Sequence, residues 1–297
     1  MYRPEGVYPA MPTPFRRNGD LDAGLLRELI EYFEGTGVNG LLVMGTAGEF
    51  AMMSEAERRT VVDVATGAAR KLELLLNVGW ASTRETIALA RYAKDAGASA
   101  VIVVAPYFYH PAPGGMARHY LDVAEATDGP VIAYNIPSFS GNRLTPDIMD
   151  DFARDRRIVG LKDSGGDAAA LSEFIARAPE GFSVLVGMDS LVSAGLALGA
   201  KGMAIGSASI APEICVEMYR AMKSGNHCRA FELQRSLDHA IRAMQAGTFP
   251  AAIKYAMGYF GHPAGYVRAP LQELNDAQRQ EVEKHLKNIR IMKEQLL

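Results

Sequence analysis

The chain has 297 residues, of which 48% are hydrophobic and 22% charged, and its formal net charge is -3 at pH 7. This composition excludes a disordered chain, and the small net charge gives no electrostatic basis for binding nucleic acid or an anionic membrane. The sequence shows no signal peptide and no apolar run long enough to span a membrane. The two cysteines, Cys215 and Cys228, and the lack of clustered histidines predict neither disulfides nor a metal site, and favour a reducing, cytoplasmic setting.

Short apolar runs with the length of buried strands recur along the chain. They cover residues 7–11, 38–44, 74–78, 100–105, 131–134, 158–161, 183–186 and 202–205. Segments with helical spacing of apolar residues lie between them, including 21–33, 54–68, 83–96 and 211–222. Capping boxes are expected at Ser54 and Ser82, because each serine is followed three positions later by a glutamate.

Strands and helices that alternate at intervals of roughly 20–35 residues predict a parallel sheet. Eight such units without a dinucleotide-binding fingerprint favour closure into a (β/α)8 barrel over an open sheet. The units end near residue 224, and three further helical segments follow, at 228–246, 250–260 and 276–297. We therefore expect a catalytic barrel over residues 1–224 and a helical C-terminal extension over residues 225–297 that packs on the barrel.

The second strand run leads into Gly45-Thr46-Ala47-Gly48-Glu49. Glycines on both sides of Thr46 predict a tight turn whose N–H groups could hold a carboxylate, and Thr46 would add a hydroxyl. An ordinary loop leading to the cap at Ser54 explains the same residues about equally well.

Lys162 ends the sixth run and is followed by Asp163. A lysine where a buried strand meets a loop is partly desolvated, which favours the neutral amine that can form a Schiff base with a ketone. Tyr134 ends the fifth run, and if the two strands are neighbours its phenol could shuttle protons for that amine. A lone tyrosine usually packs in the core, and a lone lysine is usually solvated or paired with a neighbour such as Asp163. Their placement at one level on consecutive strands argues against both explanations.

The loops after the last two strand runs contain Asp189, Ser190 and Ser207, and Gly187 and Ala204 complete the candidate lining there. We expect Asp189 or Ser190 to cap the following helix. These loops could also form a phosphate site, but neither holds a lysine or arginine, and an aspartate suits hydroxyl groups better.

The loop after the fourth run carries Tyr107, Phe108 and Tyr109. These aromatic residues could wall a pocket or an oligomer interface, or simply pack beneath the loop.

Three motifs together resemble the dihydrodipicolinate synthase/N-acetylneuraminate lyase superfamily: Gly45-Thr46-Ala47-Gly48-Glu49, Tyr134-Asn135-Ile136-Pro137 and Gly160-Leu161-Lys162-Asp163-Ser164. The likeness covers nearly the whole chain. It implies a class I lyase or aldolase that handles pyruvate on a (β/α)8 barrel, usually as a homotetramer, and that needs no metal or organic cofactor because the lysine supplies the electrophile.

The resemblance also assigns roles to residues of this chain. It places the Schiff-base lysine at Lys162, the proton-shuttling tyrosine at Tyr134 and the relay hydroxyl at Thr46. It places the carboxylate of pyruvate on the turn around Ala47 and Gly48, although family members usually have Thr, Ser or Gly at the position of Ala47.

Two further departures bear on the substrate. Dihydrodipicolinate synthases carry an arginine where this chain has Phe139, and they send a tyrosine across the subunit interface from the position of Phe108. Loss of a carboxylate clamp disfavours an acidic aldehyde. Asp189 resembles instead the sugar-acid branch, in which an aspartate bonds substrate hydroxyls, while N-acetylneuraminate lyases usually have a glutamate where Ser190 stands.

We therefore predict reversible cleavage of a 2-keto-3-deoxy sugar acid to pyruvate and an aldehyde, as in 2-keto-3-deoxygluconate aldolases. Asp189 and Ser207 are the candidates for the sugar hydroxyls. The alternatives are a dihydrodipicolinate synthase acting on pyruvate and aspartate semialdehyde, an N-acetylneuraminate lyase and a Schiff-base dehydratase of keto-deoxy sugar acids. More distant alternatives are a non-catalytic keto-acid-binding barrel and a sugar-phosphate enzyme.

Overall fold

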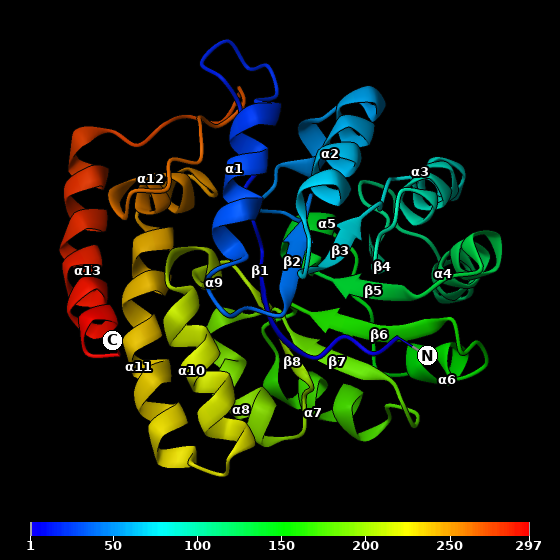
Figure 1. Ribbon diagram of the computed structural model, residues 1–297. Helices are drawn as coiled ribbons and strands as arrows, with labels where there is room; N and C mark the ends of the chain where they lie inside the picture. The colour runs from blue at the N-terminus through cyan, green and yellow to red at the C-terminus, as the bar shows by residue number, and fades with distance from the viewer. Residues whose placement is uncertain (1, 297) are drawn as a thin grey trace.

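Eight short parallel strands form one sheet in the order β1-β8-β7-β6-β5-β4-β3-β2 in a computed structural model that describes residues 2–296 (Figure 1). The first and last strands in this order meet at a bridge between Ala10 and Leu42, where the Met11 N–H donates to the Leu42 carbonyl at 3.1 Å. The predicted (β/α)8 barrel is therefore confirmed. The strands are β1 (Gly6–Pro9), β2 (Gly40–Val43), β3 (Glu73–Asn77), β4 (Ala100–Val104), β5 (Val131–Asn135), β6 (Ile158–Asp163), β7 (Ser183–Val186) and β8 (Gly202–Ile205).

Helices follow the strands and surround the barrel. Those that connect or follow the strands are α1 (Ala23–Phe33), α2 (Glu55–Ala68), α3 (Thr83–Asp95), α4 (Pro113–Thr127), α5 (Pro137–Ser140), α6 (Ile148–Phe152), α7 (Ala168–Ala176), α8 (Val192–Ala197), α9 (Ser207–Ile210) and α10 (Pro212–Lys223), with 3-10 turns η1 (Phe50–Met52) and η2 (Asp189–Leu191). Helix α1 shows why such segments form helices that pack on the rest of the protein through one face. In α1 the buried residues are Leu26, Leu29, Ile30 and Phe33, at the three- and four-residue spacing of one helix face.

The two expected capping boxes differ in the structure. At Ser54 both reciprocal bonds are present, because the serine hydroxyl accepts from the Glu57 N–H and the Glu57 carboxylate accepts from the Ser54 N–H. Ser82 also caps its helix by accepting from the Glu85 N–H. The Glu85 carboxylate, however, contacts the Ser82 hydroxyl and not its backbone N–H, so the box expected there is only half formed.

Three helices follow the last strand unit: α11 (His227–Gln245), α12 (Ala251–Tyr259) and α13 (Asp276–Glu294). In Figure 1, α10, α11 and α13 lie side by side at the edge of the barrel, and α11 contacts both of its neighbours. Between α12 and α13 the chain returns to the barrel, where Tyr266 forms a bridge with Phe15 and its N–H donates to the Phe15 carbonyl at 2.8 Å. The division of the chain at residues 224 and 225 stays a prediction. In residues 2–296 no helix is long and apolar enough to cross a membrane.

Candidate active site

Lys162 and Tyr134 lie directly opposite each other on neighbouring strands. The ladder between β5 and β6 pairs Tyr134 with Lys162, which confirms that the two strands are neighbours. Both side chains are buried, and the Lys162 Nζ lies 3.9 Å from the centroid of the Tyr134 ring. The Tyr134 hydroxyl in turn lies 3.0 Å from the Thr46 Oγ1, which comes from the loop after β2. An amine, a phenol and an alcohol thus meet at the carboxyl ends of three barrel strands.

Asp163 does not pair with Lys162, although the two residues are adjacent in the sequence. Successive strand residues point to opposite faces, and the Asp163 Oδ1 accepts instead from the Asn135 Nδ2 at 2.6 Å and from the Gly165 N–H at 3.2 Å. Burial raises the pKa of the Asp163 carboxyl, while the bond from Asn135 opposes that shift. Pairing with Asp163 is therefore not what holds Lys162.

The backbone approaches Lys162 closely at Gly187, just after β7. A Cβ placed on Gly187 would lie 2.6 Å from the Lys162 Cε and 2.1 Å from the Ser164 Oγ. Any side chain at this position would displace the lysine, so the glycine makes room for the amine beside the backbone.

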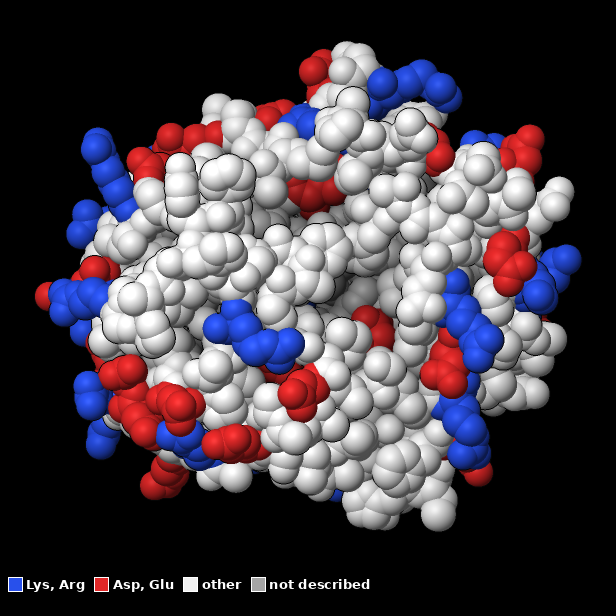
Figure 2. Space-filling model, turned by 180° about the vertical axis from the view of Figure 1, so that it is seen from behind, with Lys and Arg blue, Asp and Glu red and all other residues white. Residues whose placement is uncertain are grey.

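Lys162, Tyr134 and Thr46 open into one cavity of about 500 Å³. Its wall includes the predicted residues Ala47, Phe139, Gly187, Asp189 and Ala204. Within the described part of the chain, Lys162 and Asp189 are the charged side chains of this lining. Figure 2 shows the face opposite to the view of Figure 1, where a central hollow is bordered largely by residues that are neither acidic nor basic. The cavity therefore offers one amine, that of Lys162, and one carboxylate, that of Asp189.

The carboxylate of Asp189 lines the cavity and is held in place by a hydrogen bond from the backbone of Ser207. Its Oδ1 accepts from the Ser207 N–H at 2.8 Å. Burial raises the pKa of Asp189, while the bonds from Ser207 and the charge of Lys162 act in the opposite direction. Ser207 itself is fully buried and lies outside the cavity lining, so it meets a ligand only through Asp189.

The expectation that Asp189 or Ser190 caps the following helix is wrong. Helix α8 begins after Leu191 with no side-chain cap, and Asp189 and Ser190 both lie within the 3-10 turn η2 instead. The Asp189 side chain is directed toward β8 because its oxygen bonds the backbone of Ser207. This leaves the carboxylate available to the cavity.

The loop after β2 forms the expected tight turn at residues 45–48. The Gly48 N–H donates to the Gly45 carbonyl at 3.0 Å, so this donor is already engaged within the turn. The Ala47 N–H donates to no other group among the described residues, and Ala47 lines the cavity next to Thr46. The Ala47 N–H and the Thr46 hydroxyl are therefore donors that this wall of the cavity can offer to a ligand.

A second cavity, of about 240 Å³, adjoins the first and is mostly apolar. Both cavities are lined by Thr46, Ile136, Phe139 and Phe249, and the second also by Phe50 and Tyr107. The next two residues of the loop after β4 do not line it. Phe108 is 81% exposed and Tyr109 73% exposed, and their rings stack edge to face at 5.1 Å.

The C-terminal extension contributes to the cavity, which could not be predicted from the sequence. Ile241, Met244 and Gln245 from the end of α11, with Gly247 and Phe249 after it, line the same wall. No local signal distinguishes these residues, because an apolar stripe on a helix predicts burial and does not reveal which neighbour covers it. Met188 and Ser138 were also missed, although each adjoins a residue that was identified. In residues 2–296 no group of three or more His, Cys, Asp or Glu side chains could hold a metal ion.

A comparison with known proteins places this geometry in a family. The model of the Dihydrodipicolinate synthetase family matches residues 3–289. A 4-hydroxy-tetrahydrodipicolinate synthase of Methanothrix thermoacetophila is 37% identical over 272 residues, which cover 91% of this chain and 92% of that protein. A protein of the same name from Methanopyrus kandleri is 36% identical over 294 residues and 98% of each chain.

Solved structures with the same architecture include proteins with different names. A dihydrodipicolinate synthase from Aquifex aeolicus superposes with a TM-score of 0.92 at 32% identity, covering 96% of this chain and 98% of its own. YagE from E. coli K12, in complex with pyruvate, superposes with a TM-score of 0.93 at 28% identity and the same coverage. A sialic acid aldolase of Ruminococcus gnavus reaches 0.93 at 25% identity over 99% of each chain.

Proposed function

The chain belongs to the dihydrodipicolinate synthetase family, and from this membership we propose that Lys162 is the residue that binds pyruvate covalently. The protein is a lyase that acts through a Schiff base between a lysine and pyruvate, and this chemistry uses no further cofactor. The observation that carries the assignment of Lys162 is its position: it is buried, opposite Tyr134, and opens into a cavity with Thr46. A buried amine beside two hydroxyls has what imine formation needs.

The proposed reaction begins when the neutral Lys162 amine adds to the C2 carbonyl of pyruvate. The carbinolamine gains a proton on its oxygen and loses water, which leaves an iminium. Removal of a C3 proton gives an enamine, whose C3 forms a bond to the carbonyl carbon of an aldehyde while the aldehyde oxygen takes up a proton. Hydrolysis of the new iminium releases the product and the free lysine. The Tyr134 hydroxyl, bonded to Thr46, carries the protons, and the reverse sequence cleaves the product.

For the aldehyde we propose a hydroxylated, uncharged molecule, so that the product is a 2-keto-3-deoxy sugar acid. Asp189 supports this proposal, because its carboxylate lines the cavity and can accept hydrogen bonds from hydroxyl groups. Lys162 is consumed as the nucleophile, and among the described residues no other lysine or arginine lines the cavity. A second carboxylate, such as that of aspartate semialdehyde, therefore lacks an ion-pair partner there.

Synthesis of 4-hydroxy-tetrahydrodipicolinate, from pyruvate and aspartate semialdehyde, is the second candidate. The names of the relatives favour this candidate over the first, since both of those described above carry it at 36–37% identity over nearly their whole length. The cavity lining favours the first, because Phe139 stands where the resemblance places the arginine of the synthases. The two candidates share every step up to the enamine and differ only in the aldehyde.

We further propose a cytoplasmic homotetramer. Phe108 and Tyr109 are exposed aromatic side chains beside the apolar cavity lined by Tyr107 and Phe50, and Phe108 fits the role of a residue that reaches into a second copy of the chain. Cys215 and Cys228 are both free thiols, in keeping with a reducing compartment.

Borohydride trapping tests the chemistry, and an aldehyde panel tests the substrate. Wild-type protein incubated with pyruvate and borohydride should gain the mass of reduced pyruvate on the peptide that contains Lys162, and Lys162→Ala should gain none. Product formation should then be compared for D-glyceraldehyde and for aspartate semialdehyde at equal concentration. Faster turnover of glyceraldehyde supports the sugar-acid lyase, and faster turnover of the semialdehyde supports the synthase. A folded wild-type protein that forms no adduct would remove the Schiff-base role of Lys162.

A further inference from the structure

The turn at residues 45–48 is bounded on both sides by a non-glycine residue in the left-handed region. Met44 precedes it with a φ of 57°, and Glu49 follows it with a φ of 55°. Residues with a Cβ rarely adopt this backbone conformation, and it persists only where surrounding contacts hold it. Something outside the turn must therefore fix both of its ends.

The contacts that hold the two ends come from different parts of the chain. At the first end, the Asn77 Nδ2 donates to the Met44 carbonyl at 2.8 Å. At the second end, the Glu49 Oε1 lies 2.6 Å from the Lys254 Nζ, and the Glu49 Oε2 accepts from the Arg268 N–H at 2.8 Å. The side chains of Glu49 and Lys254 are 1% and 2% exposed, so this ion pair is sealed from water.

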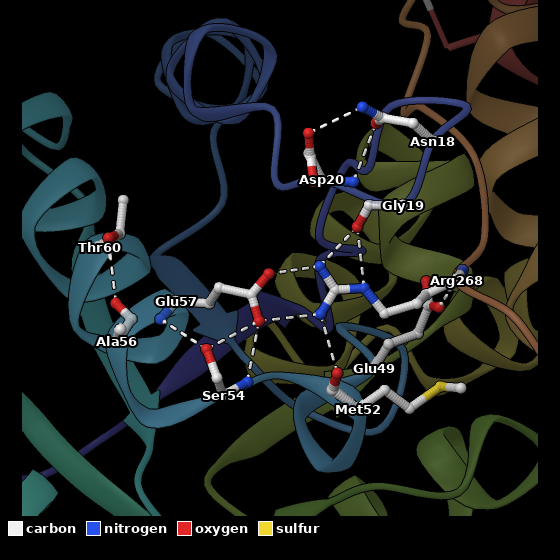
Figure 3. Close-up of polar contacts among 10 residues, drawn as sticks. All are labelled: Asn18, Gly19, Asp20, Glu49, Met52, Ser54, Ala56, Glu57, Thr60 and Arg268. Atoms are coloured by element: carbon white, nitrogen blue, oxygen red, sulfur yellow. Dashed lines mark hydrogen bonds and ion pairs between the residues drawn. The ribbon is translucent and has the colours of Figure 1, made fainter.

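The two partners of Glu49 are themselves fixed to the barrel. The Lys254 Nζ also donates to the Tyr266 carbonyl at 2.5 Å. Figure 3 shows the guanidinium of Arg268 between the Glu57 carboxylate and the carbonyls of Gly19 and Met52, with distances of 2.8 Å to Met52 and 2.6 Å to Gly19. Every hydrogen-bonding side of this guanidinium is occupied, so the segment around residue 268 cannot shift without breaking several bonds.

Phe15 lies beneath both cations. The Lys254 Nζ is 4.8 Å and the Arg268 Cζ 4.1 Å from the centroid of its ring, and the ring is buried. The aromatic face favours two positive charges at this depth, which the carboxylates of Glu49 and Glu57 balance. The arrangement is thus a charge network between the C-terminal extension and the loop that ends the turn, buried at Glu49 and Lys254 and partly exposed at Arg268 and Glu57.

We propose that Lys254 and Arg268 are positioning residues for the Schiff-base reaction, which they support by holding Glu49 and, through it, the turn at residues 45–48. In this arrangement the Ala47 N–H and the Thr46 hydroxyl face the carboxylate of a keto acid bound to Lys162. Without its cation, the Glu49 carboxylate is buried and unpaired and turns toward water, so its left-handed conformation relaxes and both donors move. The proposal rests on the proposed role of Lys162.

Two readouts on matched variants test the proposal. The first is the pyruvate concentration that gives half-maximal borohydride adduct, and the second is hydrogen exchange of the peptide that covers residues 44–50. Lys254→Met should raise the half-saturating pyruvate concentration at least tenfold and speed exchange in that peptide. Glu49→Gln should do the same to a smaller extent, because the amide oxygen still accepts from the Arg268 N–H.

The controls remove similar contacts elsewhere. Lys94→Met deletes an amine that donates to the Thr127 carbonyl at 2.6 Å, and Arg177→Met deletes a guanidinium bonded to Asp147 and Asp150. Both should keep the half-saturating concentration within twofold of wild type. If Lys254→Met does not fold, the double variant Glu49→Gln/Lys254→Met, which leaves no charge unpaired, takes its place. It still removes the contact between residues 49 and 254, so the half-saturating concentration and the exchange at residues 44–50 should rise, to a smaller extent than expected for Lys254→Met.

The outcomes separate this proposal from the proposed function. Folded variants with wild-type half-saturation and wild-type exchange at residues 44–50 would overturn the positioning role. Exchange that rises throughout the molecule would also overturn it, because the network would then serve stability alone. If wild-type protein forms no adduct, the role of Lys162 fails, and the exchange of residues 44–50 still decides whether the network holds the turn.

Discussion

The hydroxyl oxygen of Tyr134 lies 3.0 Å from that of Thr46, although the two residues are 88 positions apart in the chain. The barrel brings them together because Tyr134 lies near the carboxyl end of β5 and Thr46 lies in the loop at the carboxyl end of β2, and the carboxyl ends of all parallel strands lie on one side of the barrel. Thr46 can accept the proton of the phenol or donate its own, so a proton can pass between the cavity and either oxygen.

We expect Tyr134→Phe to lower kcat by about 10²–10⁴-fold, since a positioned proton donor contributes about that much. The half-saturating pyruvate concentration should change less, because Lys162 and the turn at residues 45–48 remain. Thr46→Val should have the smaller effect, and the double variant should be no slower than Tyr134→Phe, as for groups that act as a unit. Steady-state and single-turnover rates check this. A Tyr134→Phe enzyme with the wild-type rate would exclude the relay.

Asp189→Asn tests the site for hydroxyl groups. Hydrogen bonds to a charged acceptor contribute about 1.5–3 kcal/mol, so we expect the KM of a hydroxylated aldehyde to rise roughly 10–100-fold. The amide still accepts from the Ser207 N–H, so the fold should be preserved. Adduct formation with pyruvate alone is the internal control and should stay close to wild type. An unchanged aldehyde KM would contradict a role of Asp189 in substrate binding.

Phe139→Arg tests the choice between the two aldehydes. Phe139 is 59% exposed and lines both cavities, so an arginine can be accommodated without disturbing the core. A guanidinium there supplies the ion-pair partner that a semialdehyde carboxylate lacks. We expect kcat/KM for aspartate semialdehyde relative to D-glyceraldehyde to rise at least about tenfold, since a charge-assisted bond contributes more than 1.4 kcal/mol. Wild-type protein that already prefers the semialdehyde, with no gain in the variant, would favour the synthase.

His119 should make the protein sensitive to mild acid. It is buried, its Nδ1 lies 2.9 Å from the Thr83 Oγ1, and burial lowers its pKa to about 4. Between that value and the ordinary histidine pKa of about 6.5, the unfolded chain binds more protons than the folded one, so stability falls as the pH falls. His119→Gln should lose roughly 2–3 kcal/mol less between pH 7 and pH 4 than wild type. Urea unfolding at several pH values measures the difference, and parallel curves would contradict it.

The ion pair of Glu57 with Arg268 should also lose stability in acid, but at a lower pH than His119 does. The hydrogen bond from Arg268 lowers the pKa of Glu57 to about 2, so the pair's contribution is present above the ordinary carboxyl pKa and is lost as the pH falls through the folded value. We expect Arg268→Met to cost more stability at pH 7 than at pH 3, and the part lost on acidification should be roughly 1–2 kcal/mol after allowance for partial exposure. Arg177→Met is the control for a surface network. A cost for Arg268→Met that does not change with pH would show that Glu57 does not titrate with the pair.

Most of the barrel could be predicted from the local pattern of apolar residues along the chain. Strand bounds agree with the expected runs to within two residues at each end. The largest extension is at β6, which continues to Asp163 because the ladder with β5 extends through Asn135. The pairing of Tyr134 with Lys162 could be predicted because both residues lie at the ends of consecutive apolar runs in the sequence. The pattern of a few neighbouring residues is enough to predict a buried strand or the apolar face of a helix. The order of the strands then follows, because a parallel barrel has one order for them.

Other features depend on contacts between distant parts of the chain, which one sequence does not reveal. The side chain of Asp189 could cap a helix or bond a neighbouring strand, and only the position of Ser207 decides between them. The cavity wall from α11 and the bonds of Glu49 to Lys254 and Arg268 join segments about 200 residues apart. Lys254 lies within a mostly apolar helix and carries no local sign of its partner.

The buried bonds of Glu49 also set an order of events during synthesis of the chain. All eight strands have been made by residue 205, whereas Arg268 follows Glu49 by 219 positions. At about 5–20 residues per second, a ribosome needs roughly 3–13 s to travel from residue 205 to residue 268. The barrel can therefore close around Lys162 while the neighbouring turn is still free at one end. A nascent chain that ends before α12 carries Lys162 without the fixed turn, so the proposed keto-acid site is completed only after residue 268 has been made.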